Sequence, residues 1–383
     1  MDRGIFVIRV MLLMLSLLSF PSYGDDFADA EIAAKEGRYR DVVNILTKTL
    51  DDPKLELKRQ AVAHVNRGIA YRLLNAYALA EIDLLRTMRL DPVNVIALNQ
   101  LGLLAEWVKK DDNLAASLYK RGADLKYAAS MINLAALYRE GRGVPKNPAL
   151  AFTLLLGSAE ADSPNAYSPL GVMYAKGEGT TVNSKKAFIY FQRGAEAGIS
   201  SAYYRLGFAY ERGLGTNVNL QKALRNYRFA AVQGHGEAQG ALGYFLKRGY
   251  GVEKDLTEAA TWYQLAADQG VASASNRLAW LLATCPTTSL CNGEKAVQLA
   301  LSAIEISKEE ARNPELKDKF GKVESSMNSM LDTLGAAYAR NGQFDLAIST
   351  MQDLLSSVRG KGGRYSVFKR RMADYEKGRA YQL

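Results

Sequence analysis

A fixed period of 36 residues is the sequence feature that most constrains this fold. Single residues recur at that step through the middle of the 383-residue chain. The recurring positions are Leu134, Leu170, Leu206, Leu242 and Leu278; Gly141, Gly177, Gly213 and Gly249; Gly143, Gly179, Gly215 and Gly251; Ala151, Ala187, Ala223 and Ala259; and Ala159, Ala195, Ala231 and Ala267. Such a period is typical of a solenoid, in which each supersecondary unit packs on its neighbours. We therefore expect a repeat architecture.

One unit, residues 166–201, shows the predicted construction of two helices joined by a turn. Side chains four residues apart form one stripe of the first helix (Ala166, Leu170 and Tyr174). Gly171 has no side-chain bulk, so we expect a neighbouring helix to approach closely there. Gly177 is expected to end this helix in the left-handed conformation. Asn183 is expected to cap the second helix, which then ends near Gly198.

The other units repeat these signals. Equivalent N-cap residues are Asn147, Asn219 and Asp255, and Asp255 with Glu258 predicts a capping box. Pro169 interrupts the pattern, and we expect it near the start of its helix, where proline is best tolerated.

This pattern closely resembles the Sel1-like repeat family of helical hairpins. Residues 130–281 give four clear units and the first helix of a fifth. Residues 25–129 resemble the related tetratricopeptide repeats, and 282–358 resemble a linker followed by one such repeat. The residues that carry the flanking resemblance are Gly68, Tyr71, Ala80, Pro92 and Gly102, then Ala30, Gly37, Tyr39 and Val42, then Leu334, Gly335, Tyr338, Gly342, Phe344 and Ala347. Residues 305–330 are the least regular. The resemblance implies an all-α, right-handed α-helical solenoid that acts as a scaffold and not as an enzyme.

The first residues have the pattern of a secretory signal peptide. Arg3 and Arg9 precede an apolar stretch from Val10 to Phe20, and small residues lead to an expected cleavage after Gly24. An uncleaved anchor helix is the alternative, although the apolar stretch is short for a membrane span. We expect residues 1–24 to be removed and the protein to be periplasmic or secreted, since export also makes nucleic acid an unsuitable partner.

Positive charge is concentrated at the C-terminal end. The chain has a formal net charge of +9, and residues 359–383 alone contribute +6. A solvated end is one interpretation of this basic tail, and docking on an anionic envelope surface is the other.

Residues that usually carry chemistry are scarce. The chain has only 2 His and 2 Cys, which excludes zinc fingers and multi-histidine metal sites. The Gly-x-Gly turns recur between helices, so we interpret them as helix caps and not as phosphate loops. His64 and His235 stand alone in the sequence. We therefore expect no catalytic residue, no metal and no cofactor.

Cys285 and Cys291 flank a turn-like loop in a chain that we expect to be exported. Export permits disulfides, so a disulfide that fixes the loop is favoured over two free thiols.

The resemblance also indicates where a partner binds, because the first helices line the concave face of tetratricopeptide-type hairpins. Carried over by alignment on Gly171, the candidate residues are Tyr204, Phe208, Arg212, Tyr244, Lys247, Arg248 and Trp280. Aromatic side chains bordered by Arg and Lys suit an acidic peptide or an anionic glycan, although ordinary packing between repeats would give the same aromatic pattern. The main hypothesis is an exported adaptor for a protein partner in bacterial envelope assembly, polysaccharide export or signalling. The alternative is a binder of cell-wall glycan or lipopolysaccharide.

Overall fold

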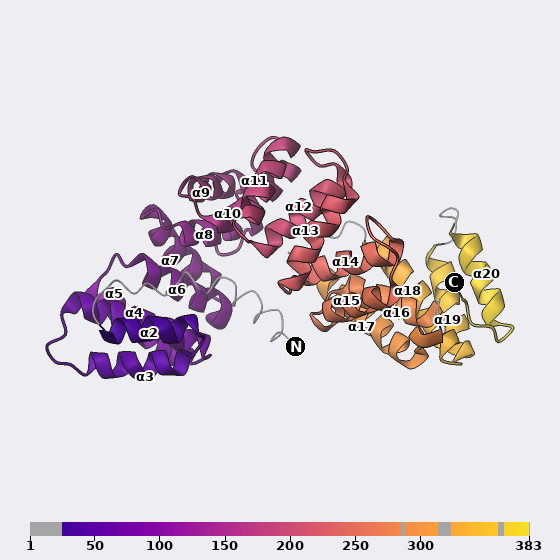
Figure 1. Cartoon of the computed structure of the whole chain (residues 1–383), viewed down its shortest axis with the longest axis horizontal. Coiled ribbons are helices and arrows are strands. Elements are labelled where there is room, and N and C mark those ends of the chain that lie inside the picture. The colour runs from indigo at the N-terminus through magenta and orange to yellow at the C-terminus, as the bar shows by residue number, and fades with distance from the viewer. Residues whose placement is uncertain (1–24, 285–287, 313–322, 359–363, 383) are drawn as a thin grey trace. The chain divides into compact units, whose positions relative to one another are not determined.

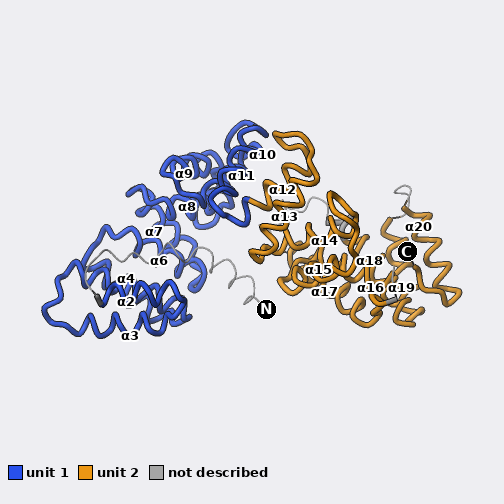
Figure 2. Tube along the Cα trace, viewed as in Figure 1, with its two compact units in different colours: residues 1–202 blue, residues 203–383 orange. Residues whose placement is uncertain are grey.

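The computed structural model describes residues 25–284, 288–312, 323–358 and 364–382. Every regular element in these residues is a helix, which confirms the predicted all-α class. Helices pair into antiparallel-type hairpins that follow one another along the chain, as expected for an α-helical solenoid (Figure 1). The chain divides between Ala202 and Tyr203 into two compact units (Figure 2). The expected signal peptide, 1–24, lies outside the described residues.

From Asp25 onward, where the structure describes it, the first unit consists of five successive hairpins. Their helices are α2 (Asp25–Lys35) with α3 (Tyr39–Leu50), α4 (Leu57–Leu73) with α5 (Tyr77–Leu90), α6 (Val95–Leu104) and the π-helix η1 (Ala105–Lys109) with α7 (Asp112–Asp124), α8 (Ala128–Glu140) with α9 (Pro148–Glu160), and α10 (Pro164–Lys176) with α11 (Ser184–Glu196). The division between the units falls inside α12 (Ser200–Arg212).

The second unit continues the same arrangement. Its further helices are α13 (Leu220–Val232), α14 (Gly236–Arg248) with α15 (Leu256–Asp268), α16 (Ala272–Thr284), the 3-10 turn η2 (Thr288–Leu290), α17 (Gly293–Arg312), α18 (Val323–Arg340) with α19 (Phe344–Ser357), and α20 (Tyr365–Tyr375). The stretch 305–330, expected to be the least regular, is helical at both ends, in α17 and α18.

Small residues allow the two helices of a hairpin to pack closely. A Cβ on Gly171 would lie 2.6 Å from the ring of Phe191 on α11. The same relation recurs 36 residues later between Gly207 and Tyr227, at 2.8 Å. The expected close approach at Gly171 is therefore confirmed, and the bulky partner on the second helix explains why glycine is needed.

The Gly-x-Gly turn has two separate functions in the fold. Gly177 caps α10 with φ of 72°, a left-handed conformation that favours glycine. Gly179 also has a positive φ, and a Cβ there would lie 2.1 Å from the carbonyl oxygen of Pro148. The first glycine thus ends a helix, while the second allows the turn to contact the start of α9 in the preceding hairpin.

The predicted N-caps form. The side chains of Asn147, Asn183, Asn219 and Asp255 each accept a hydrogen bond from a backbone N–H three residues later. Only one half of the expected capping box forms. The Asp255 carboxylate accepts from the backbone N–H of Glu258, but the Glu258 carboxylate accepts a hydrogen bond from Trp262 Nε1 over 3.1 Å.

Pro169 is not near a helix start, so that expectation is wrong. It is the sixth residue of α10, and Pro164 is the first. Because proline has no backbone N–H, α10 lacks the hydrogen bond from residue 169 to the carbonyl of residue 165. The sequence pattern misplaced the start of α10 because Pro164 itself is the favourable N-terminal proline.

The hairpin of α6 and α7 is built without a glycine turn. Helix α6 continues directly into the π-helix η1, and Lys110 then takes the left-handed conformation with φ of 57°. Asp111 follows directly as the N-cap of α7. This shorter connection explains why the 36-residue period is not continuous with the N-terminal hairpins.

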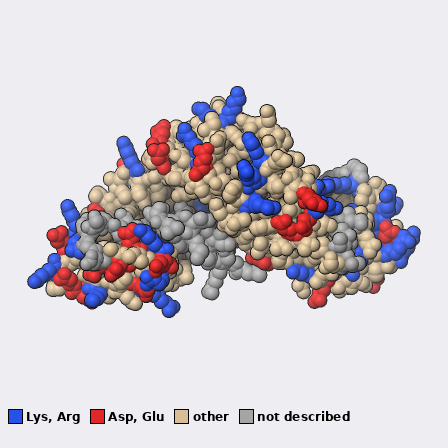
Figure 3. All heavy atoms as spheres, viewed as in Figure 1, with Lys and Arg blue, Asp and Glu red and all other residues tan. Residues whose placement is uncertain are grey.

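Part of the basic tail is an ordered element. Helix α20 packs on α19 and buries Phe368 and Tyr375. Figure 3 shows Lys and Arg side chains gathered around α20. Arg371 forms an ion pair with Asp332 of α18, so this part of the tail is not simply a solvated end. None of the described helices combines the length and the apolar composition that crossing a membrane requires.

Candidate functional site

The seven predicted partner-binding residues all lie on first helices of hairpins in the second unit. Tyr204, Phe208 and Arg212 are on α12, Tyr244, Lys247 and Arg248 on α14, and Trp280 on α16. Their surroundings divide them into two groups. We name the group on α12 and α14 the aromatic–cation face and define it as Phe208, Arg212, Tyr244, Lys247 and Arg248. Phe208 and the two arginines are exposed, whereas Tyr244 and Lys247 are half-buried.

The aromatic–cation face repeats one side-chain pair on two helices. Phe208 is 38% exposed, and the Cζ atom of Arg212 lies 5.8 Å from its ring centroid. One repeat later, Cζ of Arg248 lies 5.7 Å from the ring centroid of Tyr244. Residues four apart share one side of a helix, so each ring and its guanidinium form one continuous patch.

Arg277 on α16 contacts this face, and the sequence analysis missed it. Its Cζ atom lies 5.0 Å from the ring centroid of Tyr244, and its Nη1 donates to the carbonyl of Gly240 over 3.3 Å. Arg277 lies three residues before the candidate Trp280 on the same first helix, but the alignment on Gly171 did not select its position. Arg277 raises the positive charge around Lys247, whose pKa is lowered by burial and then by Arg248 and Arg277.

Tyr204 and Trp280 contact the chain itself. The ring of Tyr204 stacks on His235 at 4.9 Å between centroids, and burial raises the pKa of Tyr204 to about 12. The ring of Trp280 lies 6.0 Å from Tyr381 and 4.7 Å from the guanidinium of Arg371. Tyr204 therefore contacts the second helix and the closing turn of its own hairpin, and Trp280 packs on the C-terminal segment.

His64 does not stand alone as the sequence suggested. Its Nδ1 lies 2.9 Å from Oδ1 of Asp83, and Arg67 donates to both oxygens of that carboxylate. Burial by itself would raise the pKa of Asp83, but the hydrogen bonds from His64 and Arg67 outweigh it and lower the pKa. This buried cluster joins α4 to α5, and Arg67 also donates to Thr47 of α3. It is a structural feature of the first unit.

His235 is the N-cap of α14, as its place in a turn suggested. Its Nδ1 accepts a hydrogen bond from the backbone N–H of Ala238 over 3.3 Å. That bond and the ring contact with Tyr204 give the His235 side chain a structural role.

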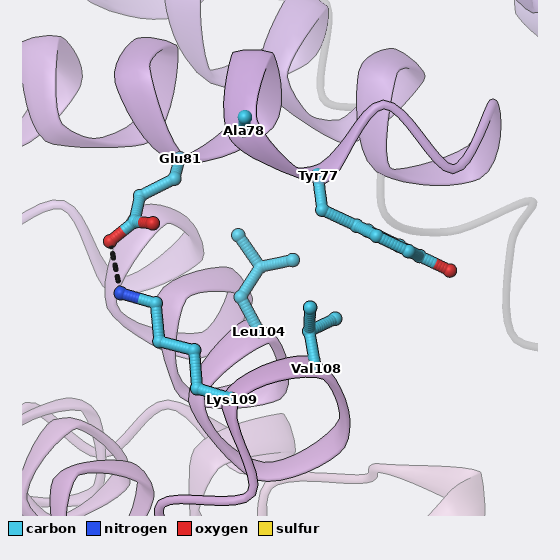
Figure 4. A pocket seen from close by; sticks show the side chains of 6 residues that line it. All are labelled: Tyr77, Ala78, Glu81, Leu104, Val108 and Lys109. Atoms are coloured by element: carbon cyan, nitrogen blue, oxygen red, sulfur yellow. Dashed lines mark hydrogen bonds and ion pairs between the residues drawn. The ribbon is translucent and has the colours of Figure 1, made fainter.

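A pocket of about 200 Å³ lies in the first unit between α5 and the end of α6 (Figure 4). The residues that line it are Tyr77, Ala78, Glu81, Leu104, Val108 and Lys109. Its two charged side chains, Glu81 and Lys109, form an ion pair with each other. The pocket therefore presents an apolar wall with one neutralised charge pair, which does not resemble a catalytic arrangement.

Within the described part of the chain, no group of three or more His, Cys, Asp or Glu side chains could hold a metal ion. Cys285 lies outside the described residues, so its disulfide with Cys291 stays a prediction.

The stacked hairpins and their two-glycine turns define the class of α-helical repeat proteins of the tetratricopeptide and Sel1-like type. The Sel1 repeat model matches five consecutive segments, 95–127, 128–163, 164–199, 200–235 and 236–271. Residues 95–271 therefore consist of Sel1 repeats. The first matched repeat lies within the segment that we assigned to tetratricopeptide-like repeats.

Solved structures agree with this class. The chain is similar to a Sel1 repeat protein from Oxalobacter formigenes, with 27% identity and a TM-score of 0.56 over 63% of this chain and 96% of that one. It also shares its fold with c5321, a protective antigen of uropathogenic Escherichia coli strains, with 21% identity and a TM-score of 0.55 over 86% of this chain and 76% of that one. No curated protein matches the sequence.

Proposed function

We propose that this protein is a non-enzymatic, exported scaffold that holds a protein partner on its aromatic–cation face. Sel1 repeats typically serve protein–protein interaction, and the fold provides an extended surface of first helices for that purpose. The proposal assigns the partner to α12 and α14 of the second unit.

One observation carries this assignment: two successive first helices present a ring and an exposed arginine four residues apart. The pairs are Phe208 with Arg212 and Tyr244 with Arg248. Aromatic and arginine side chains are enriched among the residues that dominate binding energy at protein interfaces. The rings of Tyr204 and Trp280 instead contact His235 and Arg371 of the chain itself.

The test is affinity purification of the mature chain from its native envelope after cross-linking, with mass spectrometry of the eluate. The test variant is the double substitution Arg212→Glu with Arg248→Glu. The matched control is Arg225→Glu with Lys295→Glu, because both residues are exposed on second-helix positions in α13 and α17. Both variants change the charge equally.

The expected result is one dominant protein that is lost from the test variant and retained by the control, with unchanged circular dichroism in both. Retention by the test variant would show that the partner binds elsewhere. If no protein is enriched in the eluate and the purified chain sediments with purified cell wall, the ligand is a glycan and not a protein.

Export to the bacterial periplasm, and a role in envelope assembly, polysaccharide export or signalling, form the cellular part of the proposal. The basic, apolar and small-residue order of 1–24 supports it. The test is N-terminal sequencing of the chain from fractionated cells. A mature protein that starts at Asp25 in the periplasmic fraction is expected, whereas an intact Met1 in the cytosol would contradict export.

A further inference from the structure

Two of the matched repeats place a carboxylate at one particular point between their first and second helices. In repeat 200–235, the hydroxyl of Tyr227 donates to Oε2 of Glu211 over 2.6 Å. In repeat 95–127, the hydroxyl of Tyr119 donates to Oε2 of Glu106 over 2.9 Å. Glu106 and Glu211 both stand eleven residues after the start of their repeats. The fold thus has a defined position for an acceptor opposite a buried tyrosine.

Repeat 236–271 keeps the tyrosine and lacks the carboxylate. Its equivalent residues are Tyr263 and Lys247, each 36 residues after Tyr227 and Glu211. Tyr263 is 0% exposed, and its hydroxyl has no hydrogen-bond partner among the described residues. Burial raises the pKa of Tyr263, so the hydroxyl stays a donor at neutral pH. A lysine ammonium only donates, so Lys247 cannot accept the proton of the Tyr263 hydroxyl as Glu211 accepts that of Tyr227.

Positive charges gather around the same point. Cζ of Arg277 and Cζ of Arg248 lie 5.0 and 5.7 Å from the ring centroid of Tyr244. Burial lowers the pKa of Lys247, and the charges of Arg248, Arg277 and Lys254 lower it further. Within the described part of the chain, none of these four cations forms an ion pair. Like charges held together without a counter-ion repel one another, so an anion would stabilise the group.

We propose that Lys247, Arg248, Arg277 and the Tyr263 hydroxyl form a site for a side-chain carboxylate from an acidic segment of a partner protein. We call these four residues the carboxylate site. The inference rests on the proposed function and names the chemistry that the partner presents to α14. A carboxylate is the chemical group that occupies the equivalent position in two other repeats, and arginine forks bind carboxylates through paired hydrogen bonds. Lys247 is half-buried on a flexible stem, which can turn as the anion enters.

The probe for this site is fluorescein-labelled hexaglutamate, with labelled hexalysine as the charge control. Binding to the purified mature chain is measured by fluorescence anisotropy at low ionic strength, because exposed charges are less screened there. We expect hexaglutamate to bind and hexalysine not to bind.

The decisive variant is Lys247→Glu, which recreates the glutamate–tyrosine pair of repeat 200–235. We expect it to weaken hexaglutamate binding at least ten-fold and to raise the Tm, because the Tyr263 hydroxyl gains an acceptor within the chain. Loss of binding together with a higher Tm separates occupancy of the site from unfolding. The matched control is Arg225→Glu, an equal change of charge on the exposed side of α13. It should retain binding within two-fold.

A second pair of variants tests the hydroxyl itself. We expect Tyr263→Phe to weaken hexaglutamate binding about three-fold without lowering the Tm, since the hydroxyl has no partner to lose. Tyr227→Phe should lower the Tm, because it breaks the bond to Glu211, and should leave hexaglutamate binding unchanged.

Three results would overturn the inference: equal affinity of Lys247→Glu and the unchanged chain, a lower Tm for Lys247→Glu, or displacement of hexaglutamate by equimolar inorganic phosphate. The last would reassign the site to phosphate.

Partner capture from the envelope distinguishes the two proposals. If a protein is captured but hexaglutamate does not bind, the carboxylate site is wrong and the scaffold proposal stands. If hexaglutamate binds but no protein is captured, these residues bind carboxylates, and both the scaffold proposal and the assignment of the carboxylate to a partner protein are wrong.

Discussion

At the scale of single residues, the buried carboxylate of Asp83 is the most consequential charge in the first unit. Its side chain is only 2% exposed and faces Arg67 and His64. Removing one partner of a buried ion pair leaves the other charge uncompensated, which costs about 3–5 kcal/mol. We expect Asp83→Asn to lower the Tm accordingly. Asp124→Asn, which removes an exposed pair with Lys120, should cost at most about 1 kcal/mol.

The pH dependence of stability gives a second measurement on Asp83. Its folded pKa is lowered below the ordinary value, so its contribution is present above about pH 4 and is lost as the pH falls through the folded pKa. In urea unfolding between pH 6 and pH 3, the unchanged chain should therefore lose more stability than Asp83→Asn. If the free energy of unfolding fell equally with pH in the two proteins, Asp83 would not have a lowered pKa in the folded state.

Residues that repeat were predictable from the sequence, and residues that do not repeat were not. Gly177 and Asn183 act through hydrogen bonds to backbone a few residues away, so their type and period sufficed. Asp83 and His64 are 19 residues apart and recur nowhere, so only the packing of α4 on α5 brings them together. The same is true of Arg277, whose contact with Tyr244 crosses from one repeat to the next.

At the scale of elements, the turn after a first helix is fixed by its contact with the preceding hairpin. Gly179→Ala would place a Cβ 2.1 Å from the carbonyl oxygen of Pro148 and strain a φ of 69°. Gly198→Ala is the matched control: its φ is 82°, and a Cβ would meet nothing within 4 Å. Both should lose about 1 kcal/mol to the left-handed conformation, and Gly179→Ala should lose at least about 1 kcal/mol more through the clash. Equal Tm values for the two variants would exclude the contact with α9.

Helix α10 carries a proline that the other first helices lack. An interior proline costs a helix about 3 kcal/mol, while the gain from a stiffer unfolded chain is about 1 kcal/mol or less. We therefore expect Pro169→Ala to stabilise the protein by about 2 kcal/mol and raise its Tm. Pro164→Ala, at the first residue of the same helix, should leave the Tm unchanged or slightly lower. A fall in the Tm of Pro169→Ala would show that neighbouring side chains have adapted to the interrupted helix.

The length of elements was harder to predict than their existence. The apolar stripe and the glycine stop located α10, but two prolines five residues apart both fit a helix start. The end of the π-helix η1 could not be predicted from the sequence. Lys110 ends it in a left-handed conformation, which sequence reasoning expects of glycine.

At the scale of the whole molecule, the division between Ala202 and Tyr203 has no counterpart in composition or period. The 36-residue pattern runs through it, so sequence reasoning predicted one continuous array. The C-terminal segment is the other feature that only the structure gives. Tyr381 and Arg371 reach Trp280, about a hundred residues earlier, because α20 packs on α19.

Stability in a repeat array should spread only to neighbouring hairpins, because each hairpin contacts only the next ones. We expect Asp83→Asn to speed hydrogen exchange at least ten-fold in α3, α4 and α5, which surround its carboxylate. Amides in α14, α15 and α16 should change less than two-fold, since their core cluster contains no residue of the first unit. The measurement is hydrogen-exchange mass spectrometry under native conditions, with Asp124→Asn as the control.

Equal acceleration of exchange in both regions would mean that the chain opens in one cooperative step. Substitutions in the first unit would then alter partner binding through global unfolding. Confined acceleration would instead allow the aromatic–cation face to be studied in variants whose N-terminal hairpins are weakened.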